Sequence, residues 1–201
     1  RLAAAGYPDR ARLFYVRLAE TLTNPTEVAL LAQMAEKRGD HQLALQVGKK
    51  AYTRGLPVET LAFPTAAIPR TVKTTSIEKS IVYAIARQES AFNPGAVSHA
   101  GARGLLQLMP ATAKVVAKAA GLPYSLDRLT SDAGYNATIG AAHLAELVGG
   151  FNGSYIMSFA AYNAGRSRVT QWTRQYGDPR DPSVDAVDWI ERIPFSETRN
   201  Y

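Results

Sequence analysis

The chain has 201 residues, of which 46% are hydrophobic and 20% are charged, a composition typical of a globular protein with a buried core. No apolar run approaches the roughly 18–20 residues that span a bilayer. Because the chain contains no cysteine, disulfide scaffolds, thiol nucleophiles and thiolate metal sites are excluded. The chain begins at Arg1 without a signal segment, which is typical of a processed product or an excised piece.

The formal charge of +6 is unevenly distributed along the chain. Residues 1–75 carry 11 basic and 6 acidic side chains, whereas residues 76–201 carry 12 and 11. A basic half favours an acidic polymer as partner, although a basic solvated surface explains the charge equally well. Since no recognisable nucleic-acid-binding module accompanies the charge, we expect no nucleic acid partner.

Three short antiparallel helices are predicted in the first part of the chain. Asn24, followed by Pro25 and Glu27, is a typical helix start, and Asp40 begins the next helix. With the stretch 13–22, these segments resemble a helical-repeat solenoid, although no strict repeat consensus is present. Residues 63–75 contain two prolines and four threonines and are predicted to be a linker or a connection draped over the fold. We therefore expect a helical-repeat and linker region at 1–72 and a second domain at 73–201.

The second domain is predicted to be compact and all-α, because helix starts and glycine or proline stops recur along it. Asp132 and Ser154 are expected to cap two of its helices, and Thr75 or Ser76 the first. The predicted helices span residues 76–90, 110–120, 132–148, 154–164, 167–176 and 182–193.

Glu89 is the most informative residue of this domain. It follows Ile77, Ile81 and Ile85 at a spacing of four, so its carboxylate continues a buried helical stripe in the last helical turn. Burial and the negative end of the helix dipole both raise the pKa of a carboxyl group, as a general acid near neutral pH requires. The alternative is an exposed glutamate, or one paired with Arg87 or Arg103.

Two further segments carry groups suited to binding a sugar. Residues 98–110 contain glycines that permit close backbone approach, and Gln107 should face away from its neighbours Leu106 and Leu108. Residues 159–165 form a helix of small residues that carries Tyr162 and Asn163 before a glycine. An aromatic ring and amides suit the apolar face and the hydroxyl groups of a sugar.

These segments resemble the signature of soluble lytic transglycosylases. The Arg-Gln-Glu-Ser-Ala-Phe-Asn-Pro and Gly-Ala-Arg-Gly-Leu-Leu-Gln-Leu-Met-Pro blocks lie within 87–110. The Ala-Ala-Tyr-Asn-Ala-Gly block at 160–165 and the Ile-Pro-Phe-Ser-Glu-Thr-Arg-Asn-Tyr block at 193–201 follow in the family's order. The resemblance implies a lysozyme-like catalytic domain preceded by part of a helical superhelix. It also implies a closing helix after Tyr201, and it is weaker before Thr75.

The resemblance implies a peptidoglycan substrate, a periplasmic location, other cell-wall enzymes as candidate partners, and no cofactor. It makes Glu89 the single catalytic acid and base, producing a 1,6-anhydro-N-acetylmuramic acid end without consuming water. The residues it assigns to the substrate groove are Ser98, Gln107, Met109, Tyr162, Asn163 and Glu191.

Three alternatives to this function have to be considered. A hydrolase of the same fold would use water and a second acid, for which Asp127, Asp132 and Glu146 are candidates. A glycan-binding scaffold would have a degenerate site, against which the intact polar residues argue. Metal catalysis is not expected, because the three histidines form no spaced ligand pair, and His143 with Glu146 is typical of a helix-surface pair.

Overall fold

The computed structural model describes residues 5–70, 72 and 77–201. In these ranges the regular secondary structure is helical, apart from two isolated β-bridges that join Arg103 to Val97 and to Leu108. The expected all-α class is therefore confirmed. The helices are α1 (Pro8–Thr21), α2 (Pro25–Glu36), α3 (His41–Thr53), α4 (Glu59–Ala62), α5 (Lys79–Ser90), α6 (Pro110–Ala119), α7 (Arg128–Ser131), α8 (Ala133–Gly150), α9 (Tyr155–Ala164), α10 (Arg166–Tyr176), α11 (Ala186–Glu191) and α12 (Ser196–Arg199).

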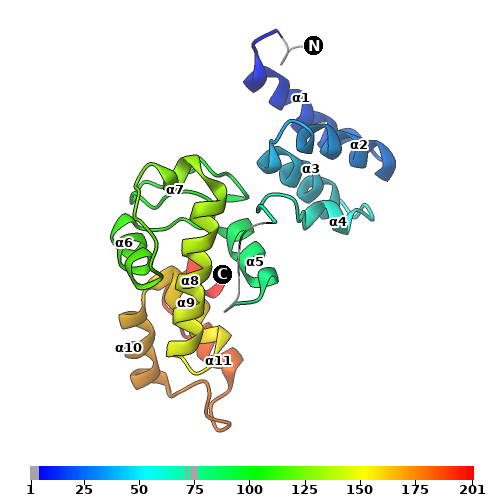
Figure 1. The fold of residues 1–201 in the computed structure, drawn as a ribbon. Helices are drawn as coiled ribbons and strands as arrows, with labels where there is room; N and C mark the ends of the chain where they lie inside the picture. The colour runs from blue at the N-terminus through cyan, green and yellow to red at the C-terminus, as the bar shows by residue number, and fades with distance from the viewer. Residues whose placement is uncertain (1–4, 71, 73–76) are drawn as a thin grey trace.

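Helices α1–α4 form one group, drawn in blue to cyan in Figure 1, in which α3 packs against the other three helices. The side chains of Asn24 and Asp40 accept hydrogen bonds from the first turns of α2 and α3, as predicted. The group has its own apolar core, which includes Tyr15, Val28 and Val47.

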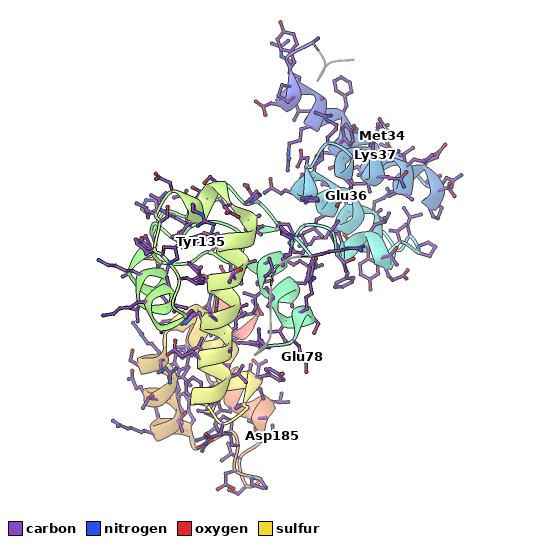
Figure 2. All side chains as sticks on the ribbon, viewed as in Figure 1. Met34, Glu36, Lys37, Glu78, Tyr135 and Asp185 are labelled. Atoms are coloured by element: carbon purple, nitrogen blue, oxygen red, sulfur yellow. The ribbon has the colours of Figure 1, made fainter. Side chains whose placement is uncertain are left out.

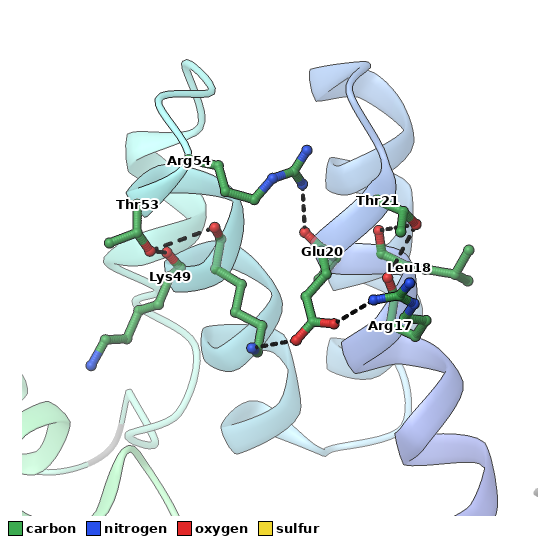
Figure 3. A network of polar contacts seen from close by, with 9 residues as sticks. Arg17, Leu18, Glu20, Thr21, Lys49, Thr53 and Arg54 are labelled. Atoms are coloured by element: carbon green, nitrogen blue, oxygen red, sulfur yellow. Dashed lines mark hydrogen bonds and ion pairs between the residues drawn. The ribbon is translucent and has the colours of Figure 1, made fainter.

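Polar contacts add to this core where α1 meets α3 (Figure 3). Lys50 Nζ lies 2.7 Å from Glu20 Oε1, and Arg17 reaches the other oxygen at 3.3 Å. Lys50, with Arg17, holds the pKa of the Glu20 carboxyl below its usual range. Arg54 donates to the carbonyls of Ala19 and Leu22. The exposed ion pairs contribute little free energy, so apolar packing is the main stabilising interaction here.

The remaining helices surround α8, which crosses the middle of this part of the molecule (Figure 1). α8 approaches the 105–108 segment closely at Gly140, where an added Cβ would lie 2.5 Å from Leu106 Cδ2. One core lies between α5, α6, α8 and the loops before α6, and a second lies between α8, α9, α10 and α11. α8 contributes to both cores, so it is the element against which the functional segments are placed.

Several helix limits differ from the prediction. α5 begins at Lys79 after Glu78, which Figure 2 labels, while the predicted caps Thr75 and Ser76 lie outside the described residues. The helix expected at 182–193 is confined to α11, because the Asp185 side chain accepts hydrogen bonds from the backbone at 187 and 188. The short helices α4, α7 and α12 carry too little periodic sequence to be predicted.

The connection between the two groups is packed rather than extended. Ile68 and Val72, with Leu45 of α3, belong to the core beneath α5, and Arg87 Nε donates to the Ala62 carbonyl at 3.0 Å. The expected domain boundary between 72 and 73 adjoins residues outside the described ranges and stays a prediction. Within the described residues, no helix is both long and apolar enough to cross a membrane.

Candidate active site

The last turn of α5 presents Glu89. The helix ends because Ala91 and Phe92 have positive φ angles of 51° and 64°, and the Phe92 ring is 2% exposed. Next to Glu89, the buried Ser90 hydroxyl donates to the Leu105 carbonyl at 2.8 Å. Burying Phe92 and tying Ser90 to the following loop offsets the strain of the left-handed residues. The helix end that carries Glu89 is therefore fixed on two sides.

The Glu89 carboxyl group is partly buried and held by one phenol. Tyr201 Oη donates to Glu89 Oε1 at 2.7 Å. Burial raises the pKa of Glu89, the Tyr201 hydrogen bond lowers it by less, and the charge of Glu197 raises it further. No ion pair joins Glu89 to Arg87 or Arg103 in the described part of the chain. The raised pKa agrees with the direction expected from burial, and a carboxyl group with a raised pKa retains its proton at higher pH.

The loop between α5 and α6 is anchored to α8 by one amide. Asn136, 1% exposed, accepts a hydrogen bond from Leu106 N and donates to the carbonyls of Arg103 and Leu129, each at 2.9 Å. Gly104 has a φ of +77°, and a Cβ there would lie 2.0 Å from the Leu129 carbonyl oxygen. This position therefore requires glycine, because the loop backbone lies directly against the backbone of α7 and the Asn136 side chain of α8.

The same loop carries three of the predicted groove residues. Gln107, at a φ of +45°, is partly exposed while Leu106 and Leu108 are buried, as predicted. Its Nε2 donates to the carbonyls of Gly104 and Ala96. Ser98 Oγ accepts from Ala102 N at 3.0 Å. Met109 is 43% exposed just before α6. Ser98 and Gln107 thus stabilise the loop through these bonds.

α9 brings Tyr162 and Asn163 toward the end of the chain. Tyr162 Oη donates to the Leu106 carbonyl at 2.7 Å, and its ring is stacked on the Tyr201 ring at 6.4 Å between centroids. Asn163 donates to Glu197 Oε1 at 3.1 Å and accepts from Thr198 Oγ1 at 2.6 Å. The loop, α9 and the last segment therefore meet next to Glu89.

Glu191 is placed differently from the other predicted groove residues. It is the exposed last residue of α11, and no hydrogen bond or ion pair joins it to another described side chain. The residues that sequence reasoning missed are Glu197 and Tyr201. Both lie in the 193–201 block that resembles the family, so the sequence contained a signal for them. Glu191 was the groove residue predicted from that end of the chain.

Two of the three acids considered as second carboxylates lie in structural contacts, and the third, Asp127, is exposed. Asp132 caps α8 and pairs with Arg128 at 2.9 Å, and Glu146 pairs with Arg166 at 3.2 Å. Glu197 is the acid whose charge acts on Glu89. Among the described residues, no group of three or more His, Asp or Glu side chains is placed to hold a metal ion.

The chain is similar to known proteins in both sequence and structure. Residues 67–183 match the family described as the Transglycosylase SLT domain. The chain is 42% identical over 130 residues to a putative soluble lytic murein transglycosylase of Haemophilus influenzae, covering 65% of this chain and 21% of that protein. It is 44% identical over 126 residues to the soluble lytic murein transglycosylase of Escherichia coli K12, covering 62% and 19%.

The fold is also similar to a solved structure of the same class. The 70 kDa soluble lytic transglycosylase of Escherichia coli matches with a TM-score of 0.78 at 35% identity, covering all of this chain and 32% of that one. The chain thus spans about a fifth of the length of these curated relatives and about a third of the solved chain. Both similarities agree with the family and the fold expected from the sequence.

Proposed function

Because the chain belongs to the transglycosylase SLT domain family, we propose that it cleaves peptidoglycan glycan strands as a lytic transglycosylase, with Glu89 as the acid and the base. The observation that carries this proposal is the partly buried Glu89 carboxyl group, whose pKa is raised and whose Oε1 is fixed by Tyr201. A group of this kind can hold a proton near neutral pH and release it to a substrate oxygen.

The reaction proceeds in two proton transfers. Glu89 gives its proton to the oxygen that links N-acetylmuramic acid to N-acetylglucosamine, and the bond from C1 to that oxygen breaks. The substrate's acetamido carbonyl supports the positive charge at C1, which replaces a second carboxylate. The C6 hydroxyl then attacks C1 and gives its proton to Glu89. The products are a 1,6-anhydro sugar and a free N-acetylglucosamine end, and the enzyme returns to its starting state.

The neighbours of Glu89 have distinct proposed roles. Tyr201 orients the carboxyl group, so that Oε2 is left for the glycosidic oxygen. Tyr162 supports the Tyr201 ring by stacking on it, and Asn163 holds the last segment in place through Glu197 and Thr198. We further propose that Ser98, Gln107, Met109 and Glu191 contact the glycan. For the protein as a whole, we propose a periplasmic location and other cell-wall enzymes as partners.

Digestion of purified sacculi tests the proposal. Mass spectrometry of the released muropeptides should give anhydro ends, which are one water lighter than the reducing ends that a hydrolase produces. Glu89→Gln keeps the shape and removes the proton, so cleavage should fall by a factor of about 10² to 10⁴. The matched control is Glu59→Gln, an exposed carboxylate at the start of α4, which should retain the wild-type rate. Reducing ends, or an active Glu89→Gln variant, would overturn the assignment.

A further inference from the structure

A row of three aromatic rings leads from α8 to the catalytic carboxyl group. The His143 ring lies 5.4 Å from the Tyr162 ring, tilted by 42°, and Tyr162 is in turn stacked on Tyr201. Tyr201 ends the row with its hydrogen bond to Glu89. We call His143, Tyr162 and Tyr201 the aromatic row. Its members come from α8, α9 and the last segment, so only tertiary packing brings them together.

His143 is unusual for a residue whose sequence pattern is that of a surface pair. Its side chain is 19% exposed, and its Nδ1 lies 3.5 Å from Glu146 Oε2 but is buried and makes no hydrogen bond among the described residues. A buried polar atom without a partner costs free energy. The imidazole thus has two contacts, the long one with Glu146 and the one with the ring of Tyr162, and the second leads toward Glu89.

The charge state of His143 suits an aromatic contact. Burial lowers the pKa of its imidazole, whereas Glu146 raises it by less and Arg166 lowers it slightly further. The ring is therefore mostly neutral at neutral pH. A neutral imidazole can pack against a phenol ring as an aromatic side chain does, and it adds no positive charge behind the site.

Tyr162 is fixed at its hydroxyl end, and its ring contacts the other two members of the aromatic row. Its hydroxyl is fixed by the Leu106 carbonyl, and Leu106 is itself pressed against Gly140 of α8. The same ring contacts both His143 and Tyr201, so a tilt of Tyr162 about its fixed hydroxyl changes both contacts together. The volume and position of the His143 ring therefore decide how closely Tyr162 supports Tyr201.

We propose that His143 is a positioning residue, which keeps Tyr162 stacked on Tyr201 and thereby keeps the Tyr201 hydroxyl on Glu89. The inference rests on the proposed function, since it concerns the same site. His143 touches neither Glu89 nor a reacting atom in this scheme; it acts through two intervening rings.

Replacing the ring separates this role from ordinary packing. His143→Ala leaves a gap into which Tyr162 can tilt, and the Tyr201–Glu89 hydrogen bond weakens. Because small misplacements of catalytic groups cost up to about 10²-fold, we expect kcat to fall by about tenfold, with KM within about twofold. His143→Phe keeps a planar ring and removes both nitrogens, so it should remain within about threefold of wild type. Glu146→Gln, the control, removes the neighbouring charge and should leave kcat unchanged.

A titration of Glu89 gives a readout that does not require activity. The ionisable groups that act on the pKa of Glu89 are Glu197 and Tyr201 in the last segment, and the charge of Glu89 in turn acts on Tyr162 of α9. Loss of the Tyr201 hydrogen bond removes the influence that lowers the pKa of Glu89. The Glu89 carboxyl ¹³C resonance, assigned with Glu89→Gln, should therefore titrate at higher pH in His143→Ala than in His143→Phe. The high-pH limb of the kcat profile should move in the same direction.

The outcomes are distinguishable from failure of the proposed function. If the wild type does not cleave sacculi, the function is wrong, but the carboxyl titration still tests the aromatic row. If His143→Ala does not fold, His143→Leu, which fills most of the volume without a planar ring, should show the same shift to a smaller extent. Unchanged kcat and Glu89 titration in the folded variant would overturn the proposal. So would an equal loss of kcat in His143→Phe.

Discussion

Asn136→Leu is the substitution whose cost follows most directly from the structure. The amide is 1% exposed and makes three hydrogen bonds of 2.9 Å. Leucine leaves the Leu106 N–H and the Leu129 carbonyl without partners, whereas the Arg103 carbonyl keeps its bond from Leu108 N. Each such group costs about 1–3 kcal/mol. Taking about 1–2 kcal/mol for each of the two groups, because the loop can relax, gives a loss of about 2–4 kcal/mol in the free energy of unfolding.

Urea unfolding measures this loss. With a slope of about 2 kcal/mol per molar urea, the midpoint should fall by about 1–2 M. Gln171→Leu is the matched control, since this amide on α10 is exposed and its replacement should change stability by less than about 0.5 kcal/mol. The variant should also cleave glycan more slowly under conditions where it is folded, because the 104–107 turn loses its tie to α8. A loss below about 1 kcal/mol for Asn136→Leu would refute the reasoning.

Three further predictions concern the site and the loop beside it. Tyr201→Phe removes the hydrogen bond that lowers the pKa of Glu89, so kcat/KM should fall. The high-pH limb of its pH–rate profile should move to higher pH, and an unmoved limb would contradict this. Because folding raises the pKa of the Glu89 carboxyl group, the native state loses stability as the pH rises from the unfolded-state pKa to the higher folded-state pKa. Glu89→Gln should therefore unfold at a higher temperature than wild type at pH 7 in calorimetry, with the gain vanishing near pH ~4, the ordinary range of a carboxyl pKa; a gain that persists there would exclude the ionisation as its cause. Gly104→Ala places a Cβ 2.0 Å from a backbone oxygen at a φ of +77°, so its melting temperature should drop well below that of Gly39→Ala, where φ is also positive but the space is open.

Local sequence chemistry predicted where several helices begin. Asn24, Asp40, Asp132 and Ser154 each accept a hydrogen bond from the first turn of the helix that follows. These bonds join residues two or three positions apart, so the amino-acid order alone is sufficient to identify them. The position of Glu89 in the last turn of a half-buried helix follows from the same short-range pattern.

The contacts around Glu89 depend on distances along the chain that no local pattern contains. Tyr201 reaches Glu89 across 112 residues, and Tyr162 reaches Leu106 across 56. The sequence placed Tyr162 and Asn163 in the site by family resemblance, but it did not indicate that Tyr201 and Glu197 are their partners. The surface pattern of His143 likewise gave no sign that its ring lies against Tyr162.

The sequence by itself determined the longer helices, several of their starts and the carboxyl group proposed to carry the chemistry, because capping, periodicity and motif order are properties of neighbouring residues. Only the tertiary structure decided which groups surround that carboxyl group. The packing of α8 and α9 against the last segment sets the burial and the hydrogen bond of Glu89, and these two factors together decide when it holds a proton.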